Sequence, residues 1–340
     1  ITATDINNCT ATRQFRIIEP AGLDAGILSI ISTSCNGNST VEASPILNCG
    51  YSTSGCVVPF GTEVGTAANS NGPNTYPAPY GDMFNSARHQ MLFTASELNA
   101  LGIQQGRMEA LSLNVDQING TNSFDNFIIR MGCTAETELT TANGFQSGLL
   151  TVFESKPVSV IPGWNTHSFD HAFTWDGNSN LIVEICFTNA LTPGGATGNT
   201  STFFSTTPFS SVIYEANDVI SACGLSSVGG SSFNRPNVRF SHCGEAFNYA
   251  WSPAPAQGQG SQTVTNLPPG SYTVTVTGVD GCTDTAQINL SAPNALSTSI
   301  NIDQPISCNG VCDGQITASA TGGTGPYTFV WSSLPGGNPT

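Results

Sequence analysis

Two distant stretches of this chain carry the same residue pattern. Cys9 and Cys282 both follow a run in which threonine alternates with apolar residues, and both are followed by threonine. Cys282 lies 273 residues after Cys9 (282 − 9), and the same offset relates the Ser-Cys-Asn-Gly runs at 34–37 and 307–310. Self-similarity of this kind indicates small repeated modules.

One copy of the module is interrupted. Trp331 follows Ser319 after 12 residues (331 − 319), whereas the equivalent Trp251 follows Ser44 after 207 (251 − 44). About 195 residues (207 − 12) are therefore inserted into one loop. Because both ends of the chain fall within modules, we expect the natural polypeptide to be longer. The predicted divisions are the tail of a preceding module at 1–20, a split module at 28–47 plus 246–293, an inserted domain at 48–245 and the head of a following module at 300–340.

The modules have the residue pattern of β-strands. Residues 271–277 alternate β-branched and aromatic residues with period two, and turns are predicted at 267–270 and 280–281. Trp251 and Trp331 each stand in a short strand, where an immunoglobulin-like sandwich has its core tryptophan. We therefore predict immunoglobulin-like sandwich modules in tandem.

The insertion also has the pattern of β structure. A short helix is predicted only at 94–101, where Leu98 and Leu101 share a face and Gly102 follows. Closely spaced strands favour an antiparallel jelly-roll-like β-sandwich. The whole chain is thus predicted to be all-β, with this sandwich inserted in one loop of a module. The strand-like segments of the insertion are 110–115, 126–131, 150–153, 167–173, 181–187, 202–204, 212–214 and 237–240.

The charge composition of the chain limits the classes of function that it can have. Only 9% of the residues are charged, against roughly 25% in an ordinary soluble protein. Eight basic residues, Lys156 being the single lysine, face 23 acidic ones, for a net charge of −15. A nucleic-acid surface needs clustered cations, so no nucleic-acid partner is expected. Since no run of about 18 apolar residues occurs, no membrane span is expected in this segment.

The 11 cysteines form no C-x-x-C pair, which favours disulfides in an extracellular setting over metal or redox chemistry. Cys35 and Cys282 belong to the first and last strands of one module, so we pair them. Cys9 is then expected to bond to a residue that precedes this chain. Two alternatives stay open for Cys308, namely a bridge to Cys312 or a partner beyond the end of the chain.

At residues 307–332 the sequence resembles the SprB-type repeat of gliding-motility adhesins in Bacteroidota, and the match continues at 267–284. The resemblance implies very long surface proteins that are exported by the type IX secretion system, form filaments and bind substrata. The split module departs from the pattern, since Asn38-Ser39 replaces the Val311-Cys312 of the later copy.

The insertion is similar to a domain of secreted Bacteroidota proteins that use the same export route. This similarity implies location rather than chemistry, and it implies a disulfide between Cys186 and Cys223. A bridge between Cys49 and Cys243 would then close the neck of the insertion and leave Cys56 with Cys133. The similar stretches are 86–98, 163–166, 173–187 and 234–240.

Signatures of catalysis are absent from the sequence, which has no G-x-S-x-G, no H-E-x-x-H and no phosphate-binding loop. His167 and His171 flank Asp170. In a regular strand the two histidines share one face and Asp170 points to the other. We therefore expect surface or core positions for them rather than a metal site.

Two further motifs suggest small sites. Asp176, Asn178 and Asn180 offer oxygen atoms to Ca²⁺ in a tight loop, although the bidentate glutamate of a full calcium loop is missing. A plain hairpin turn is the alternative interpretation, and no other cofactor is expected. Thr285, in Asp-Thr-Ala, resembles the Bacteroidota O-glycosylation motif.

Sugar chemistry has only general candidates. Glycoside hydrolysis needs two acids facing across a cleft, and no pair stands out among Asp170, Asp176 and Glu184. Four aromatic residues near predicted loops would either stack on sugars or pack in the core: Tyr76, Tyr80, Phe84 and Trp164.

The sequence therefore predicts a non-enzymatic part of a long extracellular adhesin or filament. Its expected partners are neighbouring repeats or identical chains in a fibre, together with surface polysaccharide. One alternative is a carbohydrate- or substrate-binding accessory module of a secreted hydrolase. Enzymatic activity within 48–245, a third possibility, predicts a cleft with converging polar groups.

Overall fold

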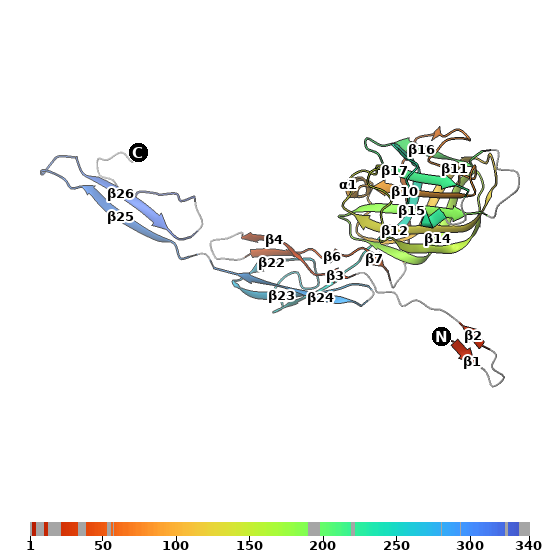
Figure 1. Ribbon diagram of the computed structural model, residues 1–340. Helices are drawn as coiled ribbons and strands as arrows, with labels where there is room; N and C mark the ends of the chain where they lie inside the picture. The colour runs from red at the N-terminus through yellow and green to blue at the C-terminus, as the bar shows by residue number, and fades with distance from the viewer. Residues whose placement is uncertain are drawn as a thin grey trace. The chain divides into compact units, whose positions relative to one another are not determined.

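The computed structural model is all-β, with one short α-helix, α1 (Ala95–Ala100), and one 3-10 turn, η1 (Ala222–Gly224), among the described residues (Figure 1). Two compact units are formed, from residues 1–24, 46–247 and 278–282 and from residues 25–45, 248–277 and 283–340. Each unit is considered by itself. The described residues are 2–4, 10–12, 22–32, 39–52, 56, 58–189, 198–218, 222–279, 281–292, 294–323 and 326–332.

The first unit contains a sandwich of two antiparallel sheets (Figure 1). One sheet has the order β13 (Leu150–Ser159), β12 (Ser123–Thr134), β15 (Asn180–Thr188), β10 (Ser86–Phe93), β17 (Val212–Asn217), β18 (Gly230–Ser232). In the second sheet, β11 (Gly106–Gln117) lies between β14 (Gly163–Trp175) and β20 (Val238–Gly244), with β7 (Gly50–Tyr51) beside β14 and β8 (Phe60–Val64) beside β20. The remaining strands of this sheet are β16 (Ser201–Thr206), β9 (Asn69–Ser70) and β19 (Asn234–Pro236). β16 pairs with β11, and β9 and β19 each pair with β16.

The inward faces of the two sheets form one apolar core. Leu111 and Val115 of β11 meet Phe127 and Ile129 of β12 in this core, and all four are almost completely buried. Period-two alternation in the sequence places these side chains on the inner face. Helix α1 confirms the expected helical segment, and the hydroxyl of Thr94 accepts a hydrogen bond from the Glu97 N–H at its N-terminus.

The six-stranded sheet is buried on its outer face as well. Leu92, Ile182 and Ile213 point away from the main core and pack against Leu139, which comes from the loop between β12 and β13. Accordingly, β15 is buried at seven successive positions rather than at alternate ones. The eight-stranded sheet thus offers the more open face for binding.

In the second unit, the strands on both sides of the long insertion pair with each other. β5 (Ser39–Ala43) pairs with β22 (Thr263–Leu267) and with β4 (Ile27–Ser32), while β23 (Gly270–Thr277) lies between β21 (Asn248–Ser252) and β24 (Thr283–Leu290). Trp251 is buried, and its indole N–H donates to the Ser261 carbonyl at 3.0 Å. Residues before and after the insertion therefore share one core.

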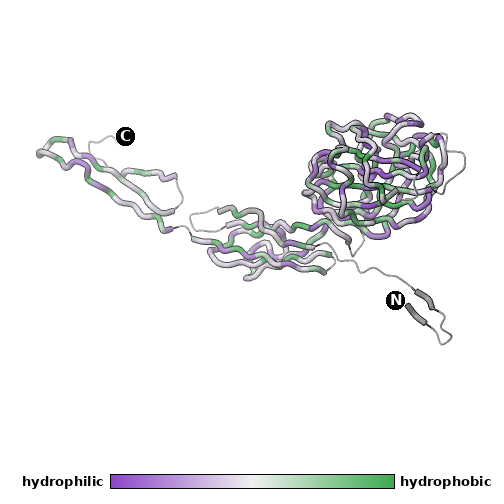
Figure 2. Tube along the Cα trace, viewed as in Figure 1, coloured by the Kyte–Doolittle hydropathy of each residue, from purple (hydrophilic) through white to green (hydrophobic). Residues whose placement is uncertain are grey.

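Three further strand pairs complete the described chain. β1 (Thr2–Thr4) pairs with β2 (Thr10–Thr12), β3 (Leu23–Asp24) with β6 (Ile46–Leu47), and β25 (Ser297–Gln304) with β26 (Gln315–Thr321). Polar and apolar residues alternate along the strands (Figure 2). Residues 329–332, where a strand around Trp331 was predicted, are not in a strand. The equivalent strand in the split module, β21, is held by pairing with β23, which follows it in the chain. In the last module, the residues that follow Trp331 from 333 to 340 lie outside the described part.

The structure corrects two predicted disulfides. Cys49 bonds to Cys133 and Cys56 bonds to Cys243, so the expected Cys49–Cys243 and Cys56–Cys133 pairs are wrong. The reason is strand pairing, because β8, which follows Cys56, pairs with β20 and opposes Phe60 to His242, next to Cys243.

The other cysteine expectations have mixed outcomes. Cys186 bonds to Cys223, the pair implied by the resemblance. Cys308 and Cys312 are both free and exposed, so no bridge joins them in the structure. Cys35 lies outside the described residues, and its pairing with Cys282 stays a prediction.

Candidate functional site

A groove opens on the outer face of the eight-stranded sheet, where β11 and β14 lose register. Met108 pairs with Phe173, but Ala110 pairs with Ser168, so Glu109 alone faces the four residues 169–172. The register of β11 with β20 shifts at the same point. Bulges of this kind redirect side chains and are common beside binding and active sites.

The groove has a volume of about 520 Å³. Ser52 and Pro59 line one wall. The Ser52 N–H donates to the Ala172 carbonyl at 2.9 Å, and the nearby Cys56 N–H donates to the Glu109 carboxylate. The wall is fixed further by the Cys56–Cys243 disulfide. The lining residues are Ser52, Pro59, Glu109, Ala110, Ser168, Phe169, Asp170, His171, Ala172 and Ser241.

Ionic contacts hold the groove side of β14. The Lys156 ammonium group lies 2.7 Å from the Asp170 carboxylate, which also accepts the Glu154 N–H at 2.8 Å. Burial acts to raise the pKa of Asp170, but these two hydrogen bonds outweigh it and hold the pKa below its usual value. His171 lies 3.4 Å from the Glu154 carboxylate, and its ring meets that of Tyr51 edge-on. The groove is therefore polar and pre-organised.

The two histidines of β14 differ in burial and in their partners. His167 points into the core, where its Nε2 lies 2.5 Å from the Tyr80 hydroxyl and its ring stacks on Phe127. His171 lines the outer groove together with Asp170. The register of β14 with β11 is lost over residues 169–172, between the two histidine positions. His167 thus occupies a core position and His171 a partly exposed position at the groove, which agrees with the expectation of core or surface positions.

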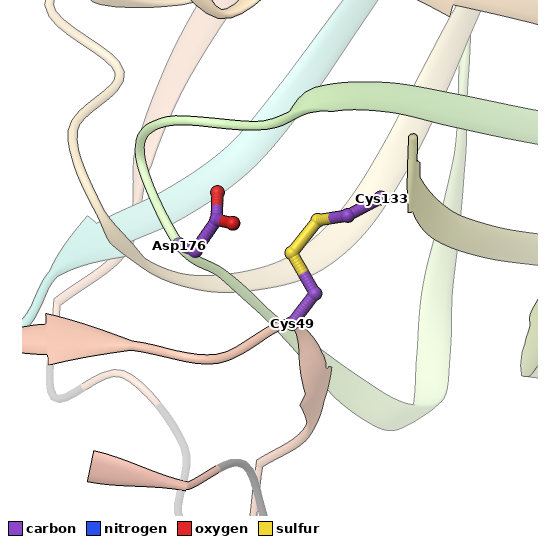
Figure 3. A group of neighbouring side chains, drawn as sticks. All are labelled: Cys49, Cys133 and Asp176. Carbon is purple, nitrogen blue, oxygen red and sulfur yellow. A yellow bond between two sulfur atoms is a disulfide. The ribbon is translucent and has the colours of Figure 1, made fainter. Parts of the chain in front are cut away.

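Among the described residues, one group of three potential metal ligands has its ligand atoms within 4.8 Å of one another: Cys49, Cys133 and Asp176 (Figure 3). The two sulfur atoms are bonded to each other (Figure 3) and are therefore not thiolate ligands. This group is structural.

The calcium candidates serve a hairpin turn. Asp176 Oδ1 accepts the N–H groups of Asn178 and Ser179 at 2.9 and 2.8 Å, and its Oδ2 accepts the Ser179 hydroxyl. Asn180 accepts the Ala95 N–H at 2.8 Å and so anchors the start of α1. Two of the three predicted ligand residues are thus occupied by structural hydrogen bonds, which favours the hairpin-turn interpretation.

The three candidate carboxylates lie in different parts of the sandwich. Glu184 is fully buried on the outer face of the six-stranded sheet, 2.7 Å from Arg88 and 2.9 Å from Arg130. Asp170 lines the groove of the other sheet, and Asp176 closes its turn. They form no pair across a cleft.

The aromatic candidates form no common platform either. Tyr80 is fully buried in the core. The ring of Tyr76 stacks between neighbours such as Tyr214, at a centroid distance of 5.3 Å. Trp164 lies beneath the guanidinium group of Arg239, at 4.3 Å.

Every cation in the described ranges is paired. The described part of the surface therefore has no spare positive charge, which disfavours polyanionic ligands there. The pairs are Arg88 and Arg130 with Glu184, Arg107 with Glu245, Lys156 with Asp170, Arg235 with Glu97 and Arg239 with Glu63.

Glu109 and Ser168 were missed by sequence reasoning, because both belong to strands of ordinary alternation and no local signal marks the bulge.

These observations define an all-β, disulfide-containing chain with an exposed polar groove. The SprB repeat family model matches residues 301–336 of the chain. SprB repeats are found in surface-exposed proteins. No curated protein and no solved structure matches the chain. Within the described part, no helix has the length and apolar character needed to cross a membrane.

Proposed function

We propose that this chain is a non-enzymatic segment of a very long cell-surface adhesin or extracellular filament of the type IX-secreted Bacteroidota kind, with a role in gliding. The main support for this proposal is the SprB match at 301–336. The patterns around Cys9 and Cys282, and around Cys35 and Cys308, are related by one offset of 273 residues, which indicates further copies of the repeat earlier in the chain. Tandem modules contact mainly their neighbours, so reach grows without a larger core.

The architecture supports this proposal. Pairing of β5 with β22 favours one immunoglobulin-like repeat that is split by the insertion. Two antiparallel sheets around one core favour a jelly-roll-like sandwich for residues 48–245. In this arrangement the repeats supply length, and the inserted domain supplies a contact surface at a loop.

We assign adhesion to the groove at Glu109 and residues 168–172. Its lining is mostly polar, and the described cations near it are already paired. With a net charge of −15, the chain repels polyanions at long range. An uncharged surface polysaccharide is therefore the ligand class that fits best.

A glycan-array screen of the whole chain tests this assignment. Ser168 is exposed in the groove, so Ser168→Trp should fill the groove and abolish binding. Ser159→Trp, at an exposed position of the other sheet, is the matched control and should leave binding intact. Absence of binding by the wild-type chain, or equal binding by both variants, would contradict a role of the groove in adhesion.

The second candidate is a substrate-targeting module of a secreted hydrolase, and the same groove favours it. A peptidase or glycosidase domain in the flanking sequence would support this alternative. Further repeats on both sides would support the filament.

A further inference from the structure

The groove continues into a strip of the same sheet face, toward the start of β14. From Ser168 back to Gly163 the register of β14 with β11 is unbroken, so side chains alternate regularly between the two faces. Ser168 lines the groove, and Thr166 and Trp164 therefore point to the same side as Ser168. Thr166 is exposed and Trp164 is partly exposed. Over these four residues the strip extends the groove by about 13 Å.

Neighbouring strands place polar side chains beside the strip. Ser112 of β11 lies opposite both Thr166 and Arg239, and its hydroxyl oxygen lies 2.8 Å from that of Thr166. The guanidinium group of Arg239 lies 2.5 Å from the Glu63 carboxylate, so its charge is already paired. The strip, like the groove, therefore favours an uncharged ligand that forms hydrogen bonds.

The indole ring of Trp164 is held in position before any ligand binds. The guanidinium group of Arg239 stacks on the ring at 4.3 Å. The turn that precedes Trp164 is closed by the Asn165 side chain, which accepts the Ile161 N–H at 2.9 Å and donates to the carbonyl oxygens of Ile161 and Gly163 at 2.7 and 2.9 Å. Because the ring is already ordered, a ligand that packs on it pays little conformational entropy.

We propose that the strip is a second subsite of the groove, and that the ligand is a straight, uncharged glycan chain of the cellulose type. This inference rests on the proposed adhesive function of the groove. One sugar ring packs on the exposed part of the Trp164 indole, hydroxyl groups of the chain bond to Thr166, and the remaining sugars occupy the groove beside Ser168.

Shape favours this class of glycan. Subsite and groove lie along one strand, so a ligand that reaches both has to be straight. In cellulose-type chains each β-linked glucose ring is turned over relative to the next, which keeps the chain straight and leaves C–H groups on two flat faces. The negative face of an aromatic ring attracts such C–H groups. Starch-type α-linked chains curve and would leave the strand before they reach Trp164.

Calorimetric titration of the whole chain with cellohexaose, cellobiose and maltohexaose tests the subsite. Cellobiose is too short to contact both Trp164 and the groove, so cellohexaose should bind about tenfold more tightly than cellobiose, and also more tightly than maltohexaose. Trp164→Ala should remove this advantage of the longer chain. Phe233→Ala, which removes an exposed aromatic ring between β18 and β19, is the matched control and should bind cellohexaose like the wild type.

Thr166→Arg provides a second variant, because it keeps Trp164 and the groove but places a bulky side chain between them, and it should also remove the advantage of cellohexaose. Thermal unfolding checks that both variants are folded. The subsite is overturned if the wild type does not bind cellohexaose, if it binds maltohexaose as tightly, or if Trp164→Ala binds cellohexaose like the wild type. The groove itself is tested separately, since Ser168→Trp would still abolish binding on the glycan array if the groove alone bound sugar.

Discussion

Acidification should destabilise the sandwich through two buried histidines. Burial lowers the pKa of His89 from 6.5 to about 3. Burial, with a smaller contribution from Lys156, lowers that of His167 from 6.5 to about 4. Both imidazole rings are almost inaccessible to solvent, and Nε2 of His167 lies 2.5 Å from the Tyr80 hydroxyl oxygen. Folding therefore keeps both imidazoles neutral.

The direction and the size of the change in unfolding free energy follow from proton linkage. Below pH 6.5 the unfolded chain binds protons at these positions and the folded chain does not, so the free energy of unfolding falls as the pH falls. One pKa unit is worth about 1.36 kcal/mol. At pH 5, about 1.5 units below the unfolded pKa, each histidine costs about 2 kcal/mol and the pair about 4 kcal/mol.

Urea unfolding at pH 7.5 and pH 5.0, followed by tryptophan fluorescence, measures this difference. His167→Gln retains a hydrogen-bonding side chain without a titrating group, so its loss of stability between the two pH values should be about 2 kcal/mol smaller than that of the wild type. His171→Gln, in the solvent-accessible groove, should behave like the wild type. An unchanged pH dependence in His167→Gln would refute the assignment of acid sensitivity to this ring.

Three further outcomes are expected. The Cys56–Cys243 disulfide spans 187 residues, so replacing both cysteines by serine should cost about 2–5 kcal/mol in denaturant unfolding, and peptide mapping of the wild type should find this bridge rather than Cys49–Cys243. Glu184→Gln removes the fully buried carboxylate that pairs with Arg88 and Arg130, and should cost about 3–5 kcal/mol in the same measurement. Glu63→Gln, at a more exposed pair, should cost less than about 1 kcal/mol. Thr285 is exposed on β24. Mass spectrometry of natively secreted protein should find a glycan on this residue, and Thr285→Ala should remove it. An unmodified wild-type peptide would contradict the assignment of the glycosylation motif.

Strand positions were largely predictable, because they follow from local alternation. The predicted strands at 181–187 and 271–277 correspond to β15 (Asn180–Thr188) and β23 (Gly270–Thr277). Internal repetition also indicated that segments on both sides of the insertion belong together, and β5 does pair with β22. These features require only neighbouring residues or a comparison of the chain with itself.

The candidate sites were not predictable in the same way. The groove exists because Glu109 faces four residues of β14. The short segments that form the groove contain no sequence pattern from which it could have been predicted.

The sequence by itself determined the all-β class, the long insertion and the scarcity of charge, since residue periodicity and composition act locally along the chain. Tertiary structure alone decided which cysteines bond to each other, how deeply His167 and His171 are buried, and where acidic side chains are buried. Those outcomes depend on which strands become neighbours, and residues as far apart as Cys56 and Cys243 become neighbours only when the sheets assemble.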